Sequence, residues 1–405
     1  MSKTKKVPNL RFQGFTDDWE QRKLGDLGSL KNGMNFSKDE MGIGFPFVNL
    51  QDIFGKSIVT KHSLGKAQAS ASQLRNYNLL KGDVLFVRSS VKLEGVGQAA
   101  VVPSDFINTT YSGFLIRFRD QNNLDDNFKS QIFKTRNIRT QIMSKATDSA
   151  NKNISQPSLS KLKIVFPNKI EQEKIGKLFK DLDKTITLHQ HKLDQLRVLK
   201  EILLQKLFAN DQHDKPELRF KDFTDKWEKV KIGSLFTEST EKSATGQLLS
   251  VSINKGVYPF DETERKNNSS KNKSNYKFVE KYDIAYNSMR MWQGAEGVSY
   301  YSGIVSPAYT VLKPQQNSNP EFYAYMFKRA EMLNKFRRYS QGLTSDTWNL
   351  KFPILKTISL RTTDIKEQEK IVQLLRMVKD NISLQQKKLT QYQQAKKFLL
   401  QQMFI

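Results

Sequence analysis

Two long stretches of the chain place an apolar residue at alternating steps of four and three positions. Neither residues 170–208 nor residues 366–404 contain a proline, and the spacing persists over five heptads in each. A repeat of 3.5 residues is typical of coiled-coil helices. At 1.5 Å per residue, each stretch predicts a helix roughly 55–60 Å long.

The heptad positions define one apolar seam on each predicted helix, and we expect the two seams to pack on each other. His189 and Gln385 lie at equivalent central positions, so an antiparallel pair would bring them face to face and fix the register. Two alternatives stay open: each helix packs on its own globular region, and His189 is a solvated flanking residue. The seam residues are Ile175, Phe179, Leu182, Ile186, His189, Leu193 and Leu196 in the first helix, and Ile371, Leu375, Val378, Ile382, Gln385, Leu389 and Tyr392 in the second.

Shorter apolar runs alternate with polar turns before each long helix and predict β-strands. The predicted strands are residues 45–48, 83–87, 99–102 and 114–118, followed by 248–253, 283–286 and 303–305. Helical stretches are predicted near 128–143 and 320–339. The predicted fold class is therefore α+β, with two globular α/β regions and two long helices that form an antiparallel coiled coil.

The chain is a tandem duplication with pseudo-two-fold character. Residues 8–27 match residues 216–235 at twelve of twenty positions, at an offset of 208. The two long stretches match at an offset of 196, so the second copy is 12 residues shorter. The middles, about 28–150 and 236–346, share little beyond Lys81-Gly-Asp83-Val84 with Lys281-Tyr-Asp283-Ile284, and Glu94-Gly-Val96 with Glu296-Gly-Val298. A repeated frame around different contents indicates one task performed on two targets.

The charge balance favours one class of target. The chain has 405 residues and a formal net charge of +25, from 66 Lys and Arg against 41 Asp and Glu. Residues 28–168 hold an excess of nine positive charges and residues 236–364 an excess of six, so 15 of the 25 lie in these regions. An excess of this kind is typical of proteins that bind polyanions, although general solubility would also account for it.

Other features argue against catalysis, metal binding and membrane insertion. The chain has no cysteine, and its four histidines show no metal-ligand spacing, so no metal site is predicted. Gly95-Val-Gly97 stands alone without a Walker loop, and Glu171-Gln-Glu173 lies at a helix start, where acids favour the helix dipole. No run of eighteen apolar residues exists, and the basic N-terminus lacks an apolar core, so we expect a cytoplasmic protein without a membrane span.

Polar segments that follow the predicted strands supply candidate DNA contacts. Arginine reads guanine, and asparagine or glutamine reads adenine, through paired hydrogen bonds in the major groove. Each residue alone is also ordinary loop surface. Residues 265–268, with Lys271 and Lys273, look like a loop that contacts phosphates. The candidates are Asn49, Gln51, Lys56, Arg88, Ser89, Ser90 and Lys92 in the first copy, and Ser252, Asn254, Lys255, Lys271, Lys273, Asn287, Arg290, Trp292 and Gln293 in the second.

These features together resemble the specificity (S) subunits of type I restriction-modification systems. The resemblance rests on the repeated P-x-L-R-F at Pro8 and Pro216, the proline-containing run into E-Q-E-K-I at Glu171 and Glu367, and the paired helices. It implies target recognition domains at 1–168 and 214–364, and conserved spacer helices at 169–213 and 365–405. Each domain would read half of a split double-stranded DNA site, and the helices would set the spacing.

The resemblance also implies which partners carry out the chemistry. Two modification (methyltransferase) subunits would dock on the helices, where Leu178, Leu188 and Leu199 lie off the seam. An ordinary wider coiled-coil face also explains these three leucines. S-adenosylmethionine, ATP and Mg²⁺ would belong to these and to the restriction (translocase and nuclease) subunits, so this chain would be non-catalytic. A stand-alone duplicated DNA-binding regulator and an RNA-binding scaffold remain as alternatives.

Overall fold

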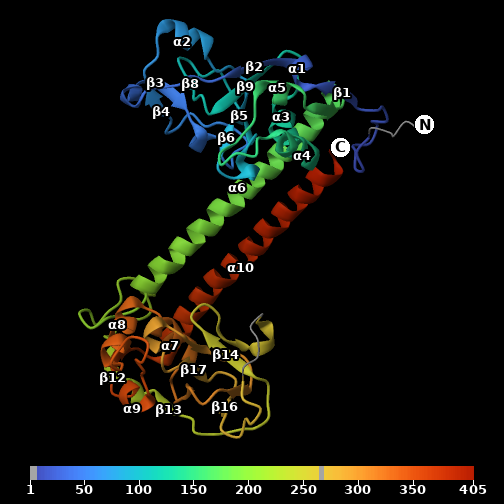
Figure 1. The fold of residues 1–405 in the computed structure, drawn as a ribbon. Helices are drawn as coiled ribbons and strands as arrows, with labels where there is room; N and C mark the ends of the chain where they lie inside the picture. Colours follow the sequence, from blue (N-terminus) through green and yellow to red (C-terminus); the bar gives the residue numbers. More distant parts are fainter. Residues whose placement is uncertain (1–6, 264–268) are drawn as a thin grey trace. The chain divides into compact units, whose positions relative to one another are not determined.

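The structure is a computed structural model that describes residues 7–263 and 269–405. It divides into two compact units, Met1–Gln190 with Lys387–Ile405, and His191–Gln386. Each unit combines one globular region with parts of both long helices, α6 (Lys169–Lys206) and α10 (Ile365–Gln402) (Figure 1). The α+β class is therefore confirmed.

A four-stranded antiparallel sheet forms the centre of the first unit. Its strands lie in the order β2 (Gly28–Asn32), β9 (Leu115–Asp120), β5 (Val84–Val87) and β7 (Ala99–Val101). Side chains alternate between the two faces of a strand. Val84 and Phe86 of β5 therefore face one hydrophobic core, and Leu85 and Val87 face another. Burial on both faces explains why β5 reads as a continuous apolar run.

Smaller elements complete the first unit. Helices cover one face of the sheet, and a three-stranded sheet in the order β4-β3-β8 supplies part of the core on the other face. The helices are α1 (Leu24–Leu27), α2 (Ala71–Asn76), α3 (Asp126–Ile132), α4 (Arg136–Lys145) and α5 (Gln156–Ser160), with 3₁₀ turns η1 (Lys38–Glu40), η2 (Leu50–Asp52) and η3 (Leu93–Gly95). The remaining strands are β1 (Glu20–Lys23) paired with β11 (Lys163–Phe166), β6 (Ser89–Ser90) paired with β10 (Lys152–Asn153), β3 (Met41–Val48), β4 (Gly65–Ala67) and β8 (Thr110–Tyr111).

The second unit repeats the central sheet with different surroundings. Its strands lie in the equivalent order β13 (Phe236–Glu238), β20 (Tyr309–Pro314), β17 (Ile284–Asn287) and β18 (Glu296–Val298). Three two-stranded pairs accompany it: β12 (Glu228–Lys231) with β21 (Ser359–Thr362), β14 (Leu249–Ser252) with β15 (Gly256–Pro259), and β16 (Lys277–Val279) with β19 (Gly303–Val305). The helices are α7 (Pro320–Phe327), α8 (Ala330–Tyr339) and α9 (Phe352–Leu355), with η4 (Ile232–Ser234), η5 (Phe260–Glu262) and η6 (Met291–Gln293).

The helical stretches predicted before each long helix are interrupted in both units. The first divides between α3 and α4 because Thr135 is extended, at φ −63° and ψ 150°. The second divides between α7 and α8 because Arg329 is extended, at φ −70° and ψ 143°. In each case the apolar periodicity continues across the break, and this continuity explains why the sequence indicated one helix.

The long helices pack on each other within each unit and run antiparallel, as predicted. In the first unit Lys396 Nζ lies 2.5 Å from Asp183 Oδ1, and the His189 ring stacks on Tyr392 at 5.1 Å. In the second unit Arg197 donates a hydrogen bond to Gln386 at 3.1 Å. From Asp183 to His189 along α6, the contacted residue of α10 goes back from Lys396 to Tyr392, so the two helices run antiparallel.

The predicted seam agrees with the burial of the helices, and the alternative also holds in part. Ile175 and Phe179 lie in the core of the first globular region, and Ile371, Leu375 and Val378 lie in the core of the second. Every predicted seam position is buried or half-buried, including His189 and Gln385. The direct pairing of these two residues stays a prediction. Leu188 and Leu199 are exposed as expected, but Leu178 is not, because it packs against the core of the first unit.

The repeated sequence motifs form the same contacts in both units. Arg11 donates to both carboxylate oxygens of Glu171 at 2.7 and 2.8 Å, and Arg219 makes the equivalent pair with Glu367 at 2.8 Å. Both glutamates are fully buried, and the bidentate hydrogen bond to Glu171 raises the pKa of Arg11. The P-x-L-R-F and E-Q-E-K-I motifs therefore hold the opening segment on the first turn of a long helix.

Each unit also uses the end of a long helix to close its core. Phe404 packs on Trp19 and Phe128 in the first unit, and Phe208 packs on Trp227 and Phe322 in the second. Across the described part of the chain, no helix is both long enough and apolar enough to cross a membrane.

Candidate nucleic-acid interface

The candidate residues of the first unit gather around the ends of β3 and β5. Asn49 follows β3 and caps η2, where its side chain accepts a hydrogen bond from the backbone N–H of Leu50 at 2.8 Å. Gln51 and Lys56 are exposed on the same segment. The backbone N–H of Gly55 donates to Gln98 Oε1 at 3.1 Å, which fixes this segment against the turn before β7.

Ser89, Ser90 and Lys92 lie beside that segment and line one pocket with it. The pocket has a volume of about 570 Å³, and Leu50 and Phe54 form part of its wall. The backbone N–H of Lys92 donates to Ser90 Oγ at 3.2 Å, so the turn that follows β6 is locally ordered. The structure thus brings two predicted segments, separated in sequence, to one surface.

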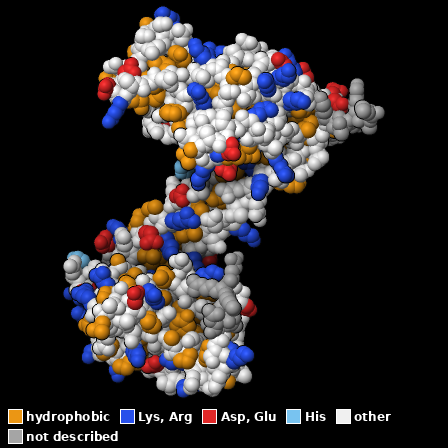
Figure 2. Space-filling model, viewed as in Figure 1, with side chains coloured by type: hydrophobic (Ala, Val, Ile, Leu, Met, Phe, Trp, Pro, Cys, Tyr) orange, Lys and Arg blue, Asp and Glu red, His pale blue; other side chains and the backbone are white. Residues whose placement is uncertain are grey.

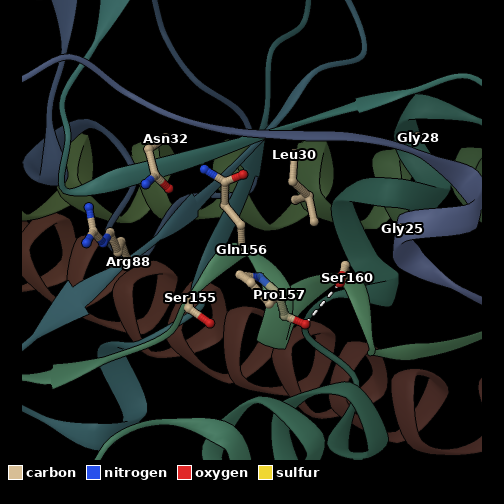
Figure 3. Close-up of a pocket in the computed structure, with 9 residues that line it drawn as sticks. All are labelled: Gly25, Gly28, Leu30, Asn32, Arg88, Ser155, Gln156, Pro157 and Ser160. Atoms are coloured by element: carbon tan, nitrogen blue, oxygen red, sulfur yellow. Dashed lines mark hydrogen bonds between the residues drawn. The ribbon is translucent and has the colours of Figure 1, made fainter.

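Arg88 does not share this surface, which corrects its grouping with Ser89 and Ser90. Its side chain lines a separate cavity of about 530 Å³ with Asn32 and Gln156 (Figure 3). Side chains of neighbouring residues in an extended segment point to opposite sides, so Arg88 and Ser89 diverge. In this cavity the Gln156 amide lies against the edge strand β2, oriented so that its nitrogen donates to the Leu30 carbonyl at 3.0 Å and its oxygen accepts from the Asn32 N–H at 2.9 Å.

The candidate residues after β17 form one compact turn in the second unit. Asn287 Oδ1 accepts from the backbone N–H of Met289 at 3.0 Å, and Arg290 donates to Gln293 at 3.3 Å. Trp292 donates to the Met289 carbonyl at 3.1 Å. Arg290 is exposed, whereas the other side chains of this set are half-buried. Arg290 is therefore an exposed side chain on a turn that hydrogen bonds hold in one conformation.

The β14–β15 turn carries Ser252, Asn254 and Lys255 at a neighbouring position. Ser252 Oγ accepts from the backbone N–H of Lys255 at 3.1 Å, and both Asn254 and Lys255 are exposed. Gly256 packs so closely on β18 that a Cβ on Gly297 would lie 2.8 Å from its Cα. This close approach places the turn beside the β17–β18 connection.

A lysine that lies close to a buried glutamate contacts the same turn. Lys328 donates to the Ile253 carbonyl at 3.2 Å, and its Nζ lies 3.9 Å from the carboxylate of Glu296. Glu296 is fully buried, and burial raises its pKa to about 8. Tyr286 of β17 and Phe86 of β5 occupy equivalent positions in the two central sheets. Tyr286 pairs with Glu296 and Phe86 pairs with Ala99, so Glu296 is equivalent to Ala99. The sequence match of Glu296 with Glu94 is therefore wrong, because the sheet pairing places Ala99 at the equivalent position. The match of Asp83 with Asp283 is confirmed.

The remaining candidates lie on the loop before β16. Lys271 is exposed, and Lys273 donates to the Ser270 carbonyl at 3.2 Å. The loop is tied to the β13–β14 connection, where the N–H of Ser243 donates to the Tyr276 carbonyl at 3.0 Å. Residues 265–268, predicted to extend this loop, lie outside the described residues.

Two further loops border the candidate surfaces and were missed by the sequence prediction. Residues 147–153 reach the first surface through β10, which pairs with β6. Residues 341–349 reach the second surface through Trp348, whose ring lies 5.3 Å from Trp292. The backbone N–H groups of Ile154 and Leu350 make equivalent bonds to Arg88 and Ser288 at 2.9 and 2.8 Å. The matched asparagines Asn153 and Asn349 were the available signal.

Comparisons with known proteins agree with the duplicated architecture. Residues 16–198 and 224–394 each match the family described as the type I restriction modification DNA specificity domain. A Methanocaldococcus jannaschii protein, named as the specificity subunit of the type I restriction enzyme MjaX, is 25% identical over 410 residues, which cover 95% of this chain and 92% of that protein. The EcoKI specificity subunit of Escherichia coli K12 is 25% identical over 191 residues, 46% of this chain and 41% of its own length.

Solved structures show the same fold. The crystal structure of the type I restriction-modification S subunit from M. genitalium matches with a TM-score of 0.60 at 15% identity, covering 98% of this chain and 99% of that one. The HsdS subunit from Thermoanaerobacter tengcongensis matches with a TM-score of 0.50 at 13% identity, covering 95% and 96%. Two matched domains in tandem, over most of the chain, establish that the protein belongs to the family of type I restriction-modification DNA specificity subunits.

Proposed function

We propose that each recognition domain binds one half of a bipartite DNA site in the major groove, and that the two halves differ in sequence. The observation that carries this proposal is the repeated sheet order, β2-β9-β5-β7 and β13-β20-β17-β18, with different side chains after the equivalent strands β5 and β17. The repeated central sheet positions the turns after β5 and β17 in the same way, and the side chains on them select the bases.

The ordered turns after these strands are the proposed base-reading elements. In the first domain they comprise the η2 segment with Asn49 and Gln51, and the turn with Ser89, Ser90 and Lys92. In the second they comprise the β14–β15 turn and the turn with Arg290 and Gln293. Exposed lysines, including Lys56, Lys255 and Lys271, serve the phosphates. Arg88 faces a separate cavity, so we assign it a role in supporting the domain and not in base contact.

The long helices, in this proposal, hold the two half-sites at a fixed spacing and dock two methyltransferase subunits. Heptad packing stiffens both helices, and off-seam apolar side chains such as Leu188 and Leu199 are exposed for a partner. Methyl transfer, ATP-driven translocation and cleavage then belong to partner subunits, which supply S-adenosylmethionine, ATP and Mg²⁺. The chain itself contributes recognition and geometry.

An exchange of one variable region tests the assignment of half-sites. Residues 28–150 are replaced by the equivalent segment of another family member, and methylated adenines are mapped across the genome of a host that carries the complex. We expect one half of the methylated motif to change while the other half stays. An unchanged motif, or simultaneous change of both halves, contradicts the proposal.

Equal lengthening of both helices tests the spacing. One heptad is inserted at equivalent positions of α6 and α10, so that the seam continues in phase. We expect both half-sites to be retained and the gap between them to widen. A methylated motif with the original gap would refute the spacer role, and tight operator binding without any methyltransferase partner would favour the stand-alone regulator.

A further inference from the structure

An apolar pocket opens among the proposed base-reading turns of the first domain. Three hydrophobic side chains at its wall are exposed: Phe54 at 37%, Val91 at 77% and Phe114 at 57%. Hydrophobic side chains also lie among basic ones on the face of this unit shown in Figure 2. Single exposed apolar residues are ordinary, but three around one cavity of about 570 Å³ mark a binding surface.

Hydrogen bonds to backbone carbonyls hold the wall of this pocket in place. The N–H of Arg88 donates to the Phe114 carbonyl at 2.8 Å, and Gln98 Nε2 donates to the Glu94 carbonyl at 3.2 Å. A Cβ on Gly95 would lie 3.0 Å from the Phe54 ring, so the ring packs directly on the η3 turn. A ligand would therefore meet a largely formed surface and lose little free energy to ordering it.

The second domain carries a smaller side chain at the position equivalent to Phe114. Leu115 pairs with Val87, and Tyr309 pairs with the equivalent residue Asn287. Leu115 and Tyr309 are therefore equivalent, and so are the residues before them, Phe114 and Ala308. The turn after β17 presents the exposed Met289 and Arg290 in place of the serine-rich turn after β5. Because the two domains share one scaffold, the apolar pocket belongs to what distinguishes their targets.

The charges around the pocket favour base edges over the phosphate backbone. Glu94 lines the pocket together with Lys92, and a carboxylate at this place repels a phosphate. In the major groove the apolar feature of a base edge is the 5-methyl group of thymine, which apolar side chains such as phenylalanine contact.

We propose that this pocket seats the 5-methyl group of a thymine, and that the half-site read by the first domain therefore contains a T·A pair at that position. The inference rests on the proposed function, because it assumes that the first domain reads DNA in the major groove. It adds a chemical identity to one base of the half-site and names Val91 and Phe114 as the side chains that select it.

Replacement of thymine by uracil tests the proposal, because it removes only the methyl group. The motif is first obtained by mapping methylated adenines. Duplexes are then made in which each thymine of the first half-site is replaced singly by uracil, and binding by the complex of this chain with its methyltransferase partners is measured. We expect one uracil substitution to weaken binding about four-fold, the effect of burying one methyl-sized group.

Variants of the pocket assign that effect to the proposed side chains. Val91→Ala and Phe114→Ala should each weaken binding to the thymine duplex and lose most of the difference between thymine and uracil. Ile107→Ala is the matched control, since Ile107 is exposed to 78%, like Val91, but lies outside the pocket. This control should keep the full difference.

The outcomes separate failure of this inference from failure of the proposed function. A first half-site without any T·A pair, no sensitivity to uracil at any position, or full sensitivity in both pocket variants would each overturn the thymine assignment while half-site reading stands. Loss of methyltransferase binding in Phe114→Ala, with DNA discrimination unchanged, would identify the pocket as a protein contact. If exchange of residues 28–150 leaves the motif unchanged, the proposed function itself fails.

Discussion

A buried carboxyl group without a hydrogen-bond donor predicts a pH-dependent stability of the second unit. Glu296 is fully buried on β18, and no described residue donates a hydrogen bond to either carboxylate oxygen. Its nearest cation is Lys328 at 3.9 Å, beyond hydrogen-bonding distance. Burial raises the pKa of Glu296 from 4.5 to about 8, so the native state holds this proton at neutral pH.

The sign and size of the effect follow from the difference in pKa between folded and unfolded chains. Between pH 4.5 and 8 the native state binds more protons at this site than the unfolded state, so stability falls as pH rises. At 1.36 kcal/mol per unit, the loss is about 3–5 kcal/mol and is complete above the folded pKa. Glu296→Gln has a similar shape and cannot ionise, so it removes this dependence.

Urea denaturation at pH 5, 7 and 9 measures the effect. Three of the four tryptophans, Trp227, Trp292 and Trp348, lie in the second unit, so intrinsic fluorescence reports mainly on its unfolding. The glutamine amide does not titrate, so burying it changes the free energy of unfolding by the same amount at every pH. We therefore expect the variant to gain about 3–5 kcal/mol on the wild type between pH 5 and pH 9.

Two comparisons make the result specific to Glu296. The pKa of Asp283 in the same unit is also raised by burial, to about 6, but Asp283 is present in both proteins and its effect cancels. Glu262→Gln, at an exposed carboxyl of the same unit, is the matched control for the loss of one carboxyl group. A constant free-energy difference between wild type and Glu296→Gln from pH 5 to pH 9 would refute the reasoning.

Two further predictions concern the repeated frame. Arg11→Ala and Arg219→Ala each leave a buried glutamate without its partner and should lower the free energy of unfolding by about 3–5 kcal/mol. The control Lys370→Ala removes only a surface ion pair and should lower it by less than about 1 kcal/mol. Equal urea midpoints for all three variants would contradict this account. Phe404→Ala removes a ring from the core of the first unit and should cost about 3–5 kcal/mol in a thermal or urea scan, while Phe398→Ala, exposed to 57%, should be nearly neutral. Similar losses in both phenylalanine variants would show that Phe404 adds no more than surface packing.

The sequence was sufficient for the long helices because their signal is local. An apolar residue every 3.5 positions specifies one face of a helix, and that face must be covered. Every predicted seam residue from Ile175 to Tyr392 is accordingly buried or half-buried. Leu178 was misplaced because it packs against the core of the first unit, to which both the globular region and the end of α10 contribute.

The candidate contacts were predicted less well, since strand ends carry little information about direction. The segments after β3 and β5 do meet, as expected for neighbouring elements of one domain. The separation of Arg88 from Ser89 depends on which side of the extended segment each residue faces, and that is decided by packing. Pairing with β10 and the position of Trp348 beside Trp292 depend on contacts far apart in sequence.

The sequence by itself determined the duplication, the long helices, the excess of positive charge and the family, because each is written in local periodicity or in repeated residues. Only the tertiary structure decided which side chains share a surface, since strand register and long-range contacts set that. It equated Glu296 with Ala99, placed Phe54 and Phe114 around one pocket, and joined the two ends of the described chain through the hydrogen bond from Leu10 to Gln402. These pairings depend on the burial of whole faces, which no local pattern of residues records.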